Sequence, residues 1–174
     1  MFTRLRKYRF LLALLVPTMP VIGYVYDMNY YTLIVGILGG AVLDFMFGRD
    51  RQNPPLETLP ELEKEGLYRA ILYAYVPIHF TLIGWGATVV ASGELAPIQL
   101  LGFMLSIGYV TGAQGITIAH ELGHKRSKLD QFLARMLLTS VCYGHFFIEH
   151  NRGHHVQVST REDPSSARFG ESFY

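Results

Sequence analysis

Four long stretches of this chain contain no Asp, Glu, Lys or Arg: residues 10–26, 28–43, 70–93 and 95–119. The last two contain 24 and 25 residues, and a helix needs about 20 apolar residues to cross a bilayer. The first two contain 17 and 16 residues, so they span only if flanking charged side chains extend to the interface. The pattern predicts an all-α polytopic membrane protein with about four transmembrane helices. A soluble helical protein is the alternative, and two successive charge-free runs of this length argue against it.

Composition narrows the possible functions. Half of the 174 residues are apolar and the net charge is +1, so nothing in the charge balance favours a nucleic-acid partner. The single cysteine, Cys142, excludes a disulfide framework and any CxxC site. Four spans leave little chain for anything else, and we expect residues 1–174 to form a single membrane domain in contact with membrane lipid.

The basic residues predict an orientation in the membrane. Lys and Arg cluster before the first charge-free run, between the second and third, and after the fourth, and they are absent from the other two connections. By the positive-inside rule, the N-terminus, a loop over residues 44–69 and the region 120–174 face the cytoplasm. The basic N-terminus could instead belong to a signal peptide, but no small-residue cleavage site follows it and a second apolar run comes at once. Within the loop, we expect a short surface helix over residues 61–69.

A fifth apolar stretch covers residues 136–148. As a helix its 13 residues would rise only about 20 Å, short of the roughly 30 Å of hydrocarbon. We therefore predict a short helix that lies at the membrane interface and does not cross. Histidine motifs flank this stretch on both sides, and a crossing would separate them onto opposite faces of the membrane.

Five of the seven histidines fall in two motifs, HELGHK at 120–125 and EHNRGHH at 149–155. Residues four apart share one face of a helix, so His120 with His124, and His150 with His154, can each clamp a cation. His155 points about 100° away from His154 and suits a second metal or another coordination edge. Ionisable groups at membrane depth are costly and tend to be functional. The two motifs predict a metal site.

The first motif is also an HExxH sequence, in which two histidines bind zinc and Glu121 would be the general base of a protease. A catalytic zinc needs only one further protein ligand, which leaves most of the second motif unused. Imidazole-rich sites with more than four ligands suit a pair of iron ions. We therefore favour two metals, and keep open an integral-membrane zinc protease and a non-catalytic membrane metal binder or transporter.

Together, the two motifs resemble those of the membrane-bound alkane 1-monooxygenases, within the histidine-rich di-iron desaturases and hydroxylases. The resemblance covers nearly the whole chain. It extends to LDFMFG, NPP, LYAYVP, YGHFFI, EDP and GESF, which lie at residues 43–48, 53–55, 72–77, 143–148, 162–164 and 170–173.

The resemblance implies a di-iron centre with nine histidine ligands. The residues on matching positions are His120, His124, His150, His154 and His155. The family's two later histidine boxes do not occur in this sequence, so the chain resembles the N-terminal part of such an enzyme, truncated before the last spans. We expect these residues alone neither to hold both irons nor to turn over. Iron analysis finding two tightly held ions per chain would contradict this.

The activity implied by the resemblance is terminal hydroxylation of medium- or long-chain n-alkanes to 1-alkanols. It uses O2 and electrons from rubredoxin, reduced by rubredoxin reductase, in a bacterial inner membrane with the metal site on the cytoplasmic side. A xylene methyl or a fatty-acid end is an open alternative substrate. Candidate residues lining an apolar route for the alkane are Trp85, Phe103, Ile107 and Phe80.

Three further residues have predicted supporting roles at the metals. Glu121 and Glu149 can orient ligand imidazoles, or else pair with Lys125 or Arg152. His145 belongs to neither ligand pair and is assigned a supporting or packing role. His79, deep in the third span, is expected to be a hydrogen-bonded structural residue. The sequence predicts neither alkane length nor oligomeric state.

Overall fold

The structure, a computed structural model, describes residues 6–48, 57, 66–163 and 165–172. These residues form helices and connecting turns, with no strand among them, which confirms the all-α prediction. The helical elements are η1 (Arg6–Leu15), α1 (Thr18–Val25), α2 (Tyr31–Leu33), η2 (Ile34–Gly39), α3 (Gly40–Phe47), α5 (Gly66–Ser92), α6 (Pro97–Tyr109), η4 (Val110–Gln114), α7 (Gly115–Gly123), α8 (Lys128–Ser140), α9 (Phe146–Ile148), η5 (Glu149–His154) and α10 (His155–Gln157).

Among the described residues, three continuous helices are long and apolar enough to cross a membrane: Lys7–Val25, Gly66–Ser92 and Pro97–Gly123. They cover nearly all of the first, third and fourth charge-free runs. The second run lies in a shorter apolar helix, Tyr31–Phe47. The chain is thus a polytopic membrane protein. Most of the predicted 44–69 loop, with residues 61–65 of its predicted surface helix, lies outside the described residues.

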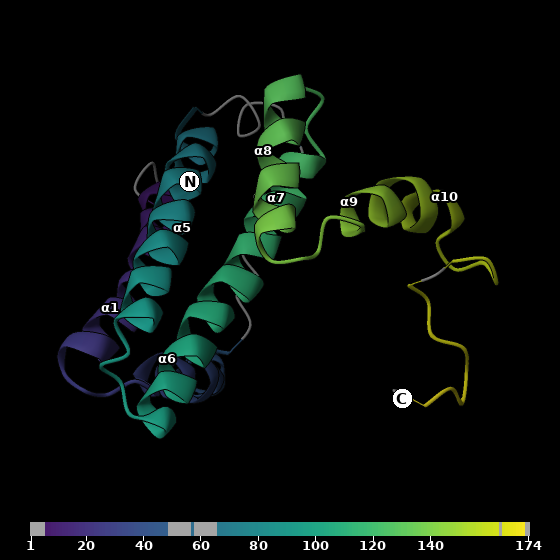
Figure 1. Cartoon of the computed structure of the whole chain (residues 1–174). Coiled ribbons are helices and arrows are strands. Elements are labelled where there is room, and N and C mark those ends of the chain that lie inside the picture. Colours follow the sequence, from purple (N-terminus) through teal and green to yellow (C-terminus); the bar gives the residue numbers. More distant parts are fainter. Residues whose placement is uncertain (1–5, 49–56, 58–65, 164, 173–174) are drawn as a thin grey trace. The chain divides into compact units, whose positions relative to one another are not determined.

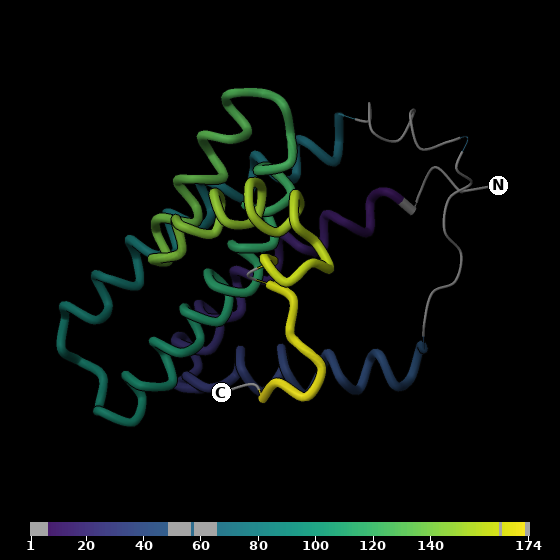
Figure 2. Tube along the Cα trace, turned by 90° about the vertical axis from the view of Figure 1, so that its right-hand side faces the viewer, coloured from purple at the N-terminus to yellow at the C-terminus, as the bar shows by residue number. Residues whose placement is uncertain are grey.

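The chain divides into two compact units between Gln114 and Gly115. In the first unit, α5 packs against η1 and α6, while α1 and α2 also contact α6 (Figure 1). The tube view traces η1 and α1 in purple, followed by the dark blue helix that contains α3 (Figure 2). Helix α6 begins at Pro97, where the Ala96 N–H donates to Gln99 Oε1 over 3.1 Å, so its N-terminus is capped.

The tight turn after α1 is fastened to α6. Asp27 adopts a left-handed φ of 55°, and the Met28 N–H donates to the Gly23 carbonyl over 2.7 Å, which closes the end of α1. Beyond the turn, the Tyr30 hydroxyl donates to the Ile98 carbonyl over 3.0 Å. The Tyr30 ring lies so near Gly102 that a Cβ there would meet ring carbons at 2.6 Å. This close approach brings the turn and α6 together and requires a glycine.

Aromatic and polar side chains fill the interior of the first unit. His79 is completely buried, with Nδ1 3.3 Å from the Tyr75 hydroxyl, in agreement with the structural role expected for it. The rings of Trp85 and Phe103 meet edge to face at 5.4 Å, and Tyr24 contacts both of them. These contacts tie α5 to α1 and α6.

The second unit begins with a helical hairpin made of α7 and α8 (Figure 1). Leu122 of α7 and three residues of α8, Ala134, Leu137 and Leu138, are each at most 1% exposed. The two helices pack against each other, so these side chains form the interior of the hairpin.

The predicted single helix over 136–148 is wrong, because α8 ends at Ser140 and α9 begins only at Phe146. Cys142 takes a left-handed φ of 57°, and the Tyr143 N–H donates to the Leu138 carbonyl over 2.8 Å. This is the hydrogen-bonding pattern of a Schellman helix end, formed here without glycine. The turn brings the second histidine motif into the same unit as the first.

Candidate metal centre

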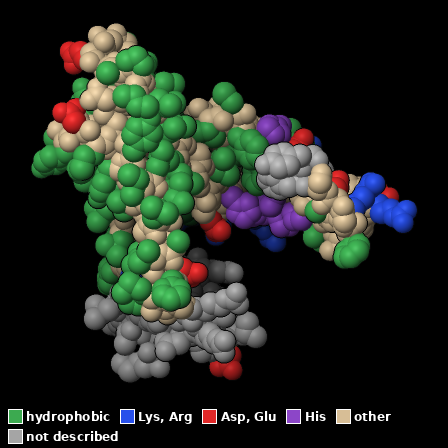
Figure 3. All heavy atoms as spheres, turned by 90° about the horizontal axis from the view of Figure 1, so that it is seen from below, with side chains coloured by type: hydrophobic (Ala, Val, Ile, Leu, Met, Phe, Trp, Pro, Cys, Tyr) green, Lys and Arg blue, Asp and Glu red, His purple; other side chains and the backbone are tan. Residues whose placement is uncertain are grey.

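Four histidine rings converge in the second unit. His120 Nε2 lies 3.0 Å from His124 Nε2 and 2.8 Å from His150 Nε2, and His155 Nε2 lies 3.0 Å from His150 Nε2. One ligand atom from each residue lies within 4.8 Å of the others. The space-filling view shows histidine side chains gathered at the surface (Figure 3). We call His120, His124, His150 and His155 the four-histidine cluster.

The first pair arises from ordinary helical spacing. His120 lies in the last turn of α7, and the His124 N–H donates to the His120 carbonyl over 3.2 Å, which continues the helical turn. The two rings therefore share a face, as the four-residue spacing predicts.

The second motif does not form the α-helix that its predicted four-residue spacing requires. Its residues Glu149–His154 form a π-helix, η5, whose turns contain about one residue more than those of an α-helix. The residue that meets His150 is consequently His155, five positions on, whereas four-residue spacing predicted His154. Short π-helical segments occur frequently at functional sites.

Aromatic packing holds the second motif beside α7 and α8. The Phe147 ring lies 3.5 Å from where a Cβ on Gly123 would be, and the Arg135 guanidinium lies 4.9 Å above the same ring. The Phe146 ring stacks on His150, with centroids 4.7 Å apart. The two motifs are therefore brought together by packing contacts as well as by their histidines.

The separations of the ring nitrogens fit a bound cation. A metal ion bonded to nitrogen at about 2.1 Å holds neighbouring ligand atoms about 3.0 Å apart in octahedral coordination and about 3.4 Å apart in tetrahedral coordination. The four close nitrogen–nitrogen separations run from 2.8 to 3.2 Å. The donor set therefore fits a transition-metal ion, and its spacing is closer to the octahedral value.

The surroundings of two cluster residues, His124 and His150, favour the neutral imidazole. Burial, together with the neighbouring imidazoles, lowers the pKa of His150 to about 4. The same causes, burial first, lower the pKa of His124. A metal binds the lone pair of a neutral imidazole, so these shifts keep ligand atoms available at neutral pH.

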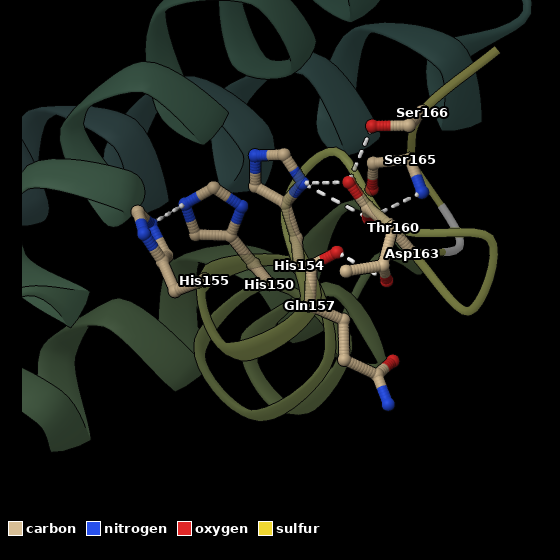
Figure 4. Close-up of polar contacts among 8 residues, drawn as sticks. All are labelled: His150, His154, His155, Gln157, Thr160, Asp163, Ser165 and Ser166. Atoms are coloured by element: carbon tan, nitrogen blue, oxygen red, sulfur yellow. Dashed lines mark hydrogen bonds and ion pairs between the residues drawn. The ribbon is translucent and has the colours of Figure 1, made fainter.

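His154 lies beside the cluster but is not one of its four members. Its Nδ1 is 3.0 Å from both carboxylate oxygens of Asp163 (Figure 4). The carboxylate also accepts the Ser165 N–H over 2.9 Å and the Ser166 hydroxyl over 2.5 Å. The pKa of Asp163 is lowered to about 2. The largest cause is the hydrogen bond from Ser166, followed by the hydrogen bonds from Ser165 and His154.

The three residues predicted to support the ligands are not members of the four-histidine cluster. Glu121 is exposed, with Oε1 3.9 Å from His120 Nδ1, on the far side of the ring from the converging Nε2 atoms. Glu149 and His145 are both exposed, and the His145 ring meets Tyr143 edge to face at 4.8 Å. Sequence analysis missed Asp163, although an Asp shortly before two serines is typical of a turn in which the carboxylate accepts nearby N–H and O–H groups.

The four residues predicted to line an alkane route lie in the first unit. Trp85 borders an apolar hollow of about 480 Å³ between α1 and α5. Phe103 is 1% exposed and packs on Trp85, while Ile107 lies against Gly86 and Phe80 against His79. Among these four, Trp85 alone lines that hollow.

Comparison with known proteins reveals a family. Residues 95–174 match the fatty acid desaturase family. The chain is 41% identical to an alkane 1-monooxygenase of Ectopseudomonas oleovorans, over 97% of this chain and 44% of that protein. It is 48% identical to alkane 1-monooxygenase 1 of Pseudomonas aeruginosa, over 83% of this chain and 38% of that protein.

A more distant relative is the hydroxylase component of a xylene/toluene monooxygenase of Pseudomonas putida. It is 28% identical over 59% of this chain and 28% of that protein. The chain spans less than half the length of the alkane 1-monooxygenases it matches. With histidine motifs that converge and relatives that align over nearly its whole length, the chain is homologous to the alkane 1-monooxygenases.

Proposed function

We propose that this chain supplies part of the catalytic unit of an alkane 1-monooxygenase, acting on medium- or long-chain n-alkanes. In the overall reaction, one alkane, one O2, two electrons and two protons give one 1-alkanol and one water. The observation that carries the proposal is the convergence of imidazoles from two separate motifs in the four-histidine cluster. The names of the aligned relatives support an alkane as the substrate.

We propose iron as the metal, in a pair of ions. The four-histidine cluster would hold one ion, and His154 would contribute to the other. Bound iron would activate dioxygen and oxidise the terminal C–H bond of the alkane. The chain's own part is to present Nε2 atoms to the metal and to hold the two motifs together through Phe147 and its contacts.

A zinc protease fits the geometry less well. A catalytic zinc keeps three protein ligands and an open position for water, whereas four imidazoles converge here. Glu121, the base that such an enzyme requires, lies near Nδ1 of His120 and away from the converging nitrogens. The relatives are monooxygenases, which also disfavours a metal transporter.

The membrane location supports the choice of substrate, because an alkane dissolves in the bilayer that surrounds the spans. Lys125, Arg126 and Lys128 follow the span that carries His120, and this favours the cytoplasmic side of an inner membrane for the cluster. A soluble rubredoxin, reduced by its reductase, would then reach the cluster from the cytoplasm as electron donor.

A chimeric enzyme tests the proposal. The aligned part of the Ectopseudomonas oleovorans alkane 1-monooxygenase is replaced by this chain, and membranes containing the chimera receive n-octane, rubredoxin, reductase, NADH and isotopically labelled dioxygen. We expect labelled 1-octanol and two iron ions per chain. His120→Ala and His150→Ala should abolish both the product and the full iron content, whereas the exposed-residue variant Lys128→Ala should retain both.

The parent enzyme serves as the positive control. A chimera that retains its iron yet forms no labelled alkanol, in membranes where the parent is active, would contradict the proposed activity. Cleavage of peptides that requires Glu121 would instead support the zinc protease.

A further inference from the structure

The Asp163 carboxylate is built into the protein as an acceptor of hydrogen bonds. Its side chain is completely buried, although the residue lies in a loop. Donors approach it from three residues: the Ser165 backbone, the Ser166 hydroxyl and His154 Nδ1. A buried carboxylate needs such donors to remain ionised, and the two serines provide them independently of His154.

We propose that Asp163 is the positioning residue of His154. An ionised carboxylate only accepts hydrogen bonds, so the Nδ1 that faces it must carry the proton. A neutral imidazole protonated at Nδ1 has its lone pair at Nε2. Asp163 therefore fixes both the ring orientation of His154 and the tautomer that can bind a metal through Nε2.

The position of His154 bears on which of the two proposed ions its Nε2 would bind. Its ring stacks beside that of His150, with centroids 5.6 Å apart and planes inclined by 24°. The nitrogen not bound to Asp163 lies on the opposite side of the ring (Figure 4). Because His154 stands outside the four-histidine cluster, its Nε2 is available to a separate ion. This step rests on the proposed di-iron function, whereas the assignment of the tautomer does not.

The inference extends the metal centre beyond the histidine motifs. Asp163 follows His154 by nine residues, and the intervening chain turns at Ser159, which has a left-handed φ of 65°. The Thr160 hydroxyl donates to the Gln157 carbonyl over 2.7 Å and closes this turn (Figure 4). The loop after α10 thereby brings a carboxylate back to the ring of a candidate ligand.

Nitrogen NMR of the full chain in lipid nanodiscs tests the proposal without turnover. Histidine is labelled with nitrogen-15, metal is removed, and spectra are recorded at a mildly alkaline pH that keeps imidazoles neutral. The variant His154→Ala identifies the signals of that ring. We expect His154 to be protonated at Nδ1 in the unmodified chain. Asp163→Ala should shift the proton to Nε2, and the matched control Glu162→Ala, an exposed acid one residue away, should change nothing.

Zinc titration of the same samples gives the metal readout. Loss of a carboxylate that orients a ligand typically weakens metal binding about 10- to 100-fold. We expect Asp163→Ala to raise by that factor the zinc concentration that half-saturates the His154 signal, and to leave the signals of His120 and His124 unchanged. Asp163→Asn, whose side-chain oxygen can still accept from Nδ1, should restore most of the affinity.

Several results would overturn the proposal. One is a His154 ring protonated at Nε2 in the unmodified chain, which that chain reveals even if Asp163→Ala does not fold. Another is an equal loss of zinc response at His154, His120 and His124, which would indicate a general structural role. Failure of the chimera to hydroxylate alkanes would leave the tautomer result standing, so the two proposals fail separately.

Discussion

The Nε2 atoms of His150 and His155 lie 3.0 Å apart although the residues are five positions apart in sequence. The π-helical winding of η5 makes this possible, because its wider turn brings residue 155 onto the face of residue 150. His154, at the spacing suited to an α-helix, instead bonds to Asp163. The local winding thus decides which histidine rings of the second motif join the four-histidine cluster.

Replacing His155 should affect the tightest metal site more than replacing His154. His155→Ala removes one of four converging nitrogens, so we expect its loss of affinity to exceed the about 10- to 100-fold typical of supporting residues. His154→Ala should leave the affinity for the first ion within a few-fold of the original. Calorimetric titration of the metal-free chain with zinc measures both, and the reverse ranking would show that His154 belongs to the first site.

The stability of the metal-free chain should depend on pH through His150. Its pKa is lowered to about 4 in the folded chain, from an ordinary value of 6.5. Between these values the unfolded chain binds more protons, so stability is greatest above pH 6.5 and falls as the pH decreases toward 4. Thermal unfolding in detergent at several pH values measures this. His150→Ala should flatten the curve, and an unchanged slope in that variant would exclude His150 as its source.

Substitution of Gly102 should destabilise the protein, whereas the same substitution at Gly108 should not. A Cβ on Gly102 would meet the Tyr30 ring at 2.6 Å, and that ring is held by the hydroxyl bond to Ile98. We expect Gly102→Ala to destabilise the fold by about 1–3 kcal/mol. Gly108→Ala, on the same helix with no atom within 4 Å of its Cβ, should be neutral or stabilising. Thermal unfolding of the two variants, measured side by side, tests this. Equal losses of stability would show that the contact between residue 102 and the Tyr30 ring is unimportant.

Cys142 provides a probe of membrane orientation. It is the single cysteine of the sequence and it is exposed, in the turn between α8 and α9. If the second unit faces the cytoplasm, a membrane-impermeant maleimide should label Cys142 in inside-out vesicles and leave it unmodified in intact cells. Cys142→Ala controls for labelling of other groups. Labelling from outside intact cells would reverse the proposed orientation.

The class of fold and the kind of site follow from local sequence patterns. Charge-free runs predict apolar helices because a bilayer interior excludes charge, and the described part of the chain contains three helices of membrane-spanning length. His120 and His124 share a helix face because their spacing matches one turn of an α-helix. Both predictions depend on neighbours along the chain, so the local sequence contains the information they need.

The winding of the second motif, and the choice of which of its histidines converge, depend instead on tertiary contacts. The stretch 136–148 looks like one apolar helix, but it breaks at Cys142, where a helix end forms without the glycine that usually signals one. Phe147 packs against Gly123 and brings together motifs separated by some thirty residues. Asp163 reaches His154 only because the chain turns back at Ser159. These outcomes depend on contacts between distant residues and on helix winding, which hydrophobic and histidine spacing do not record.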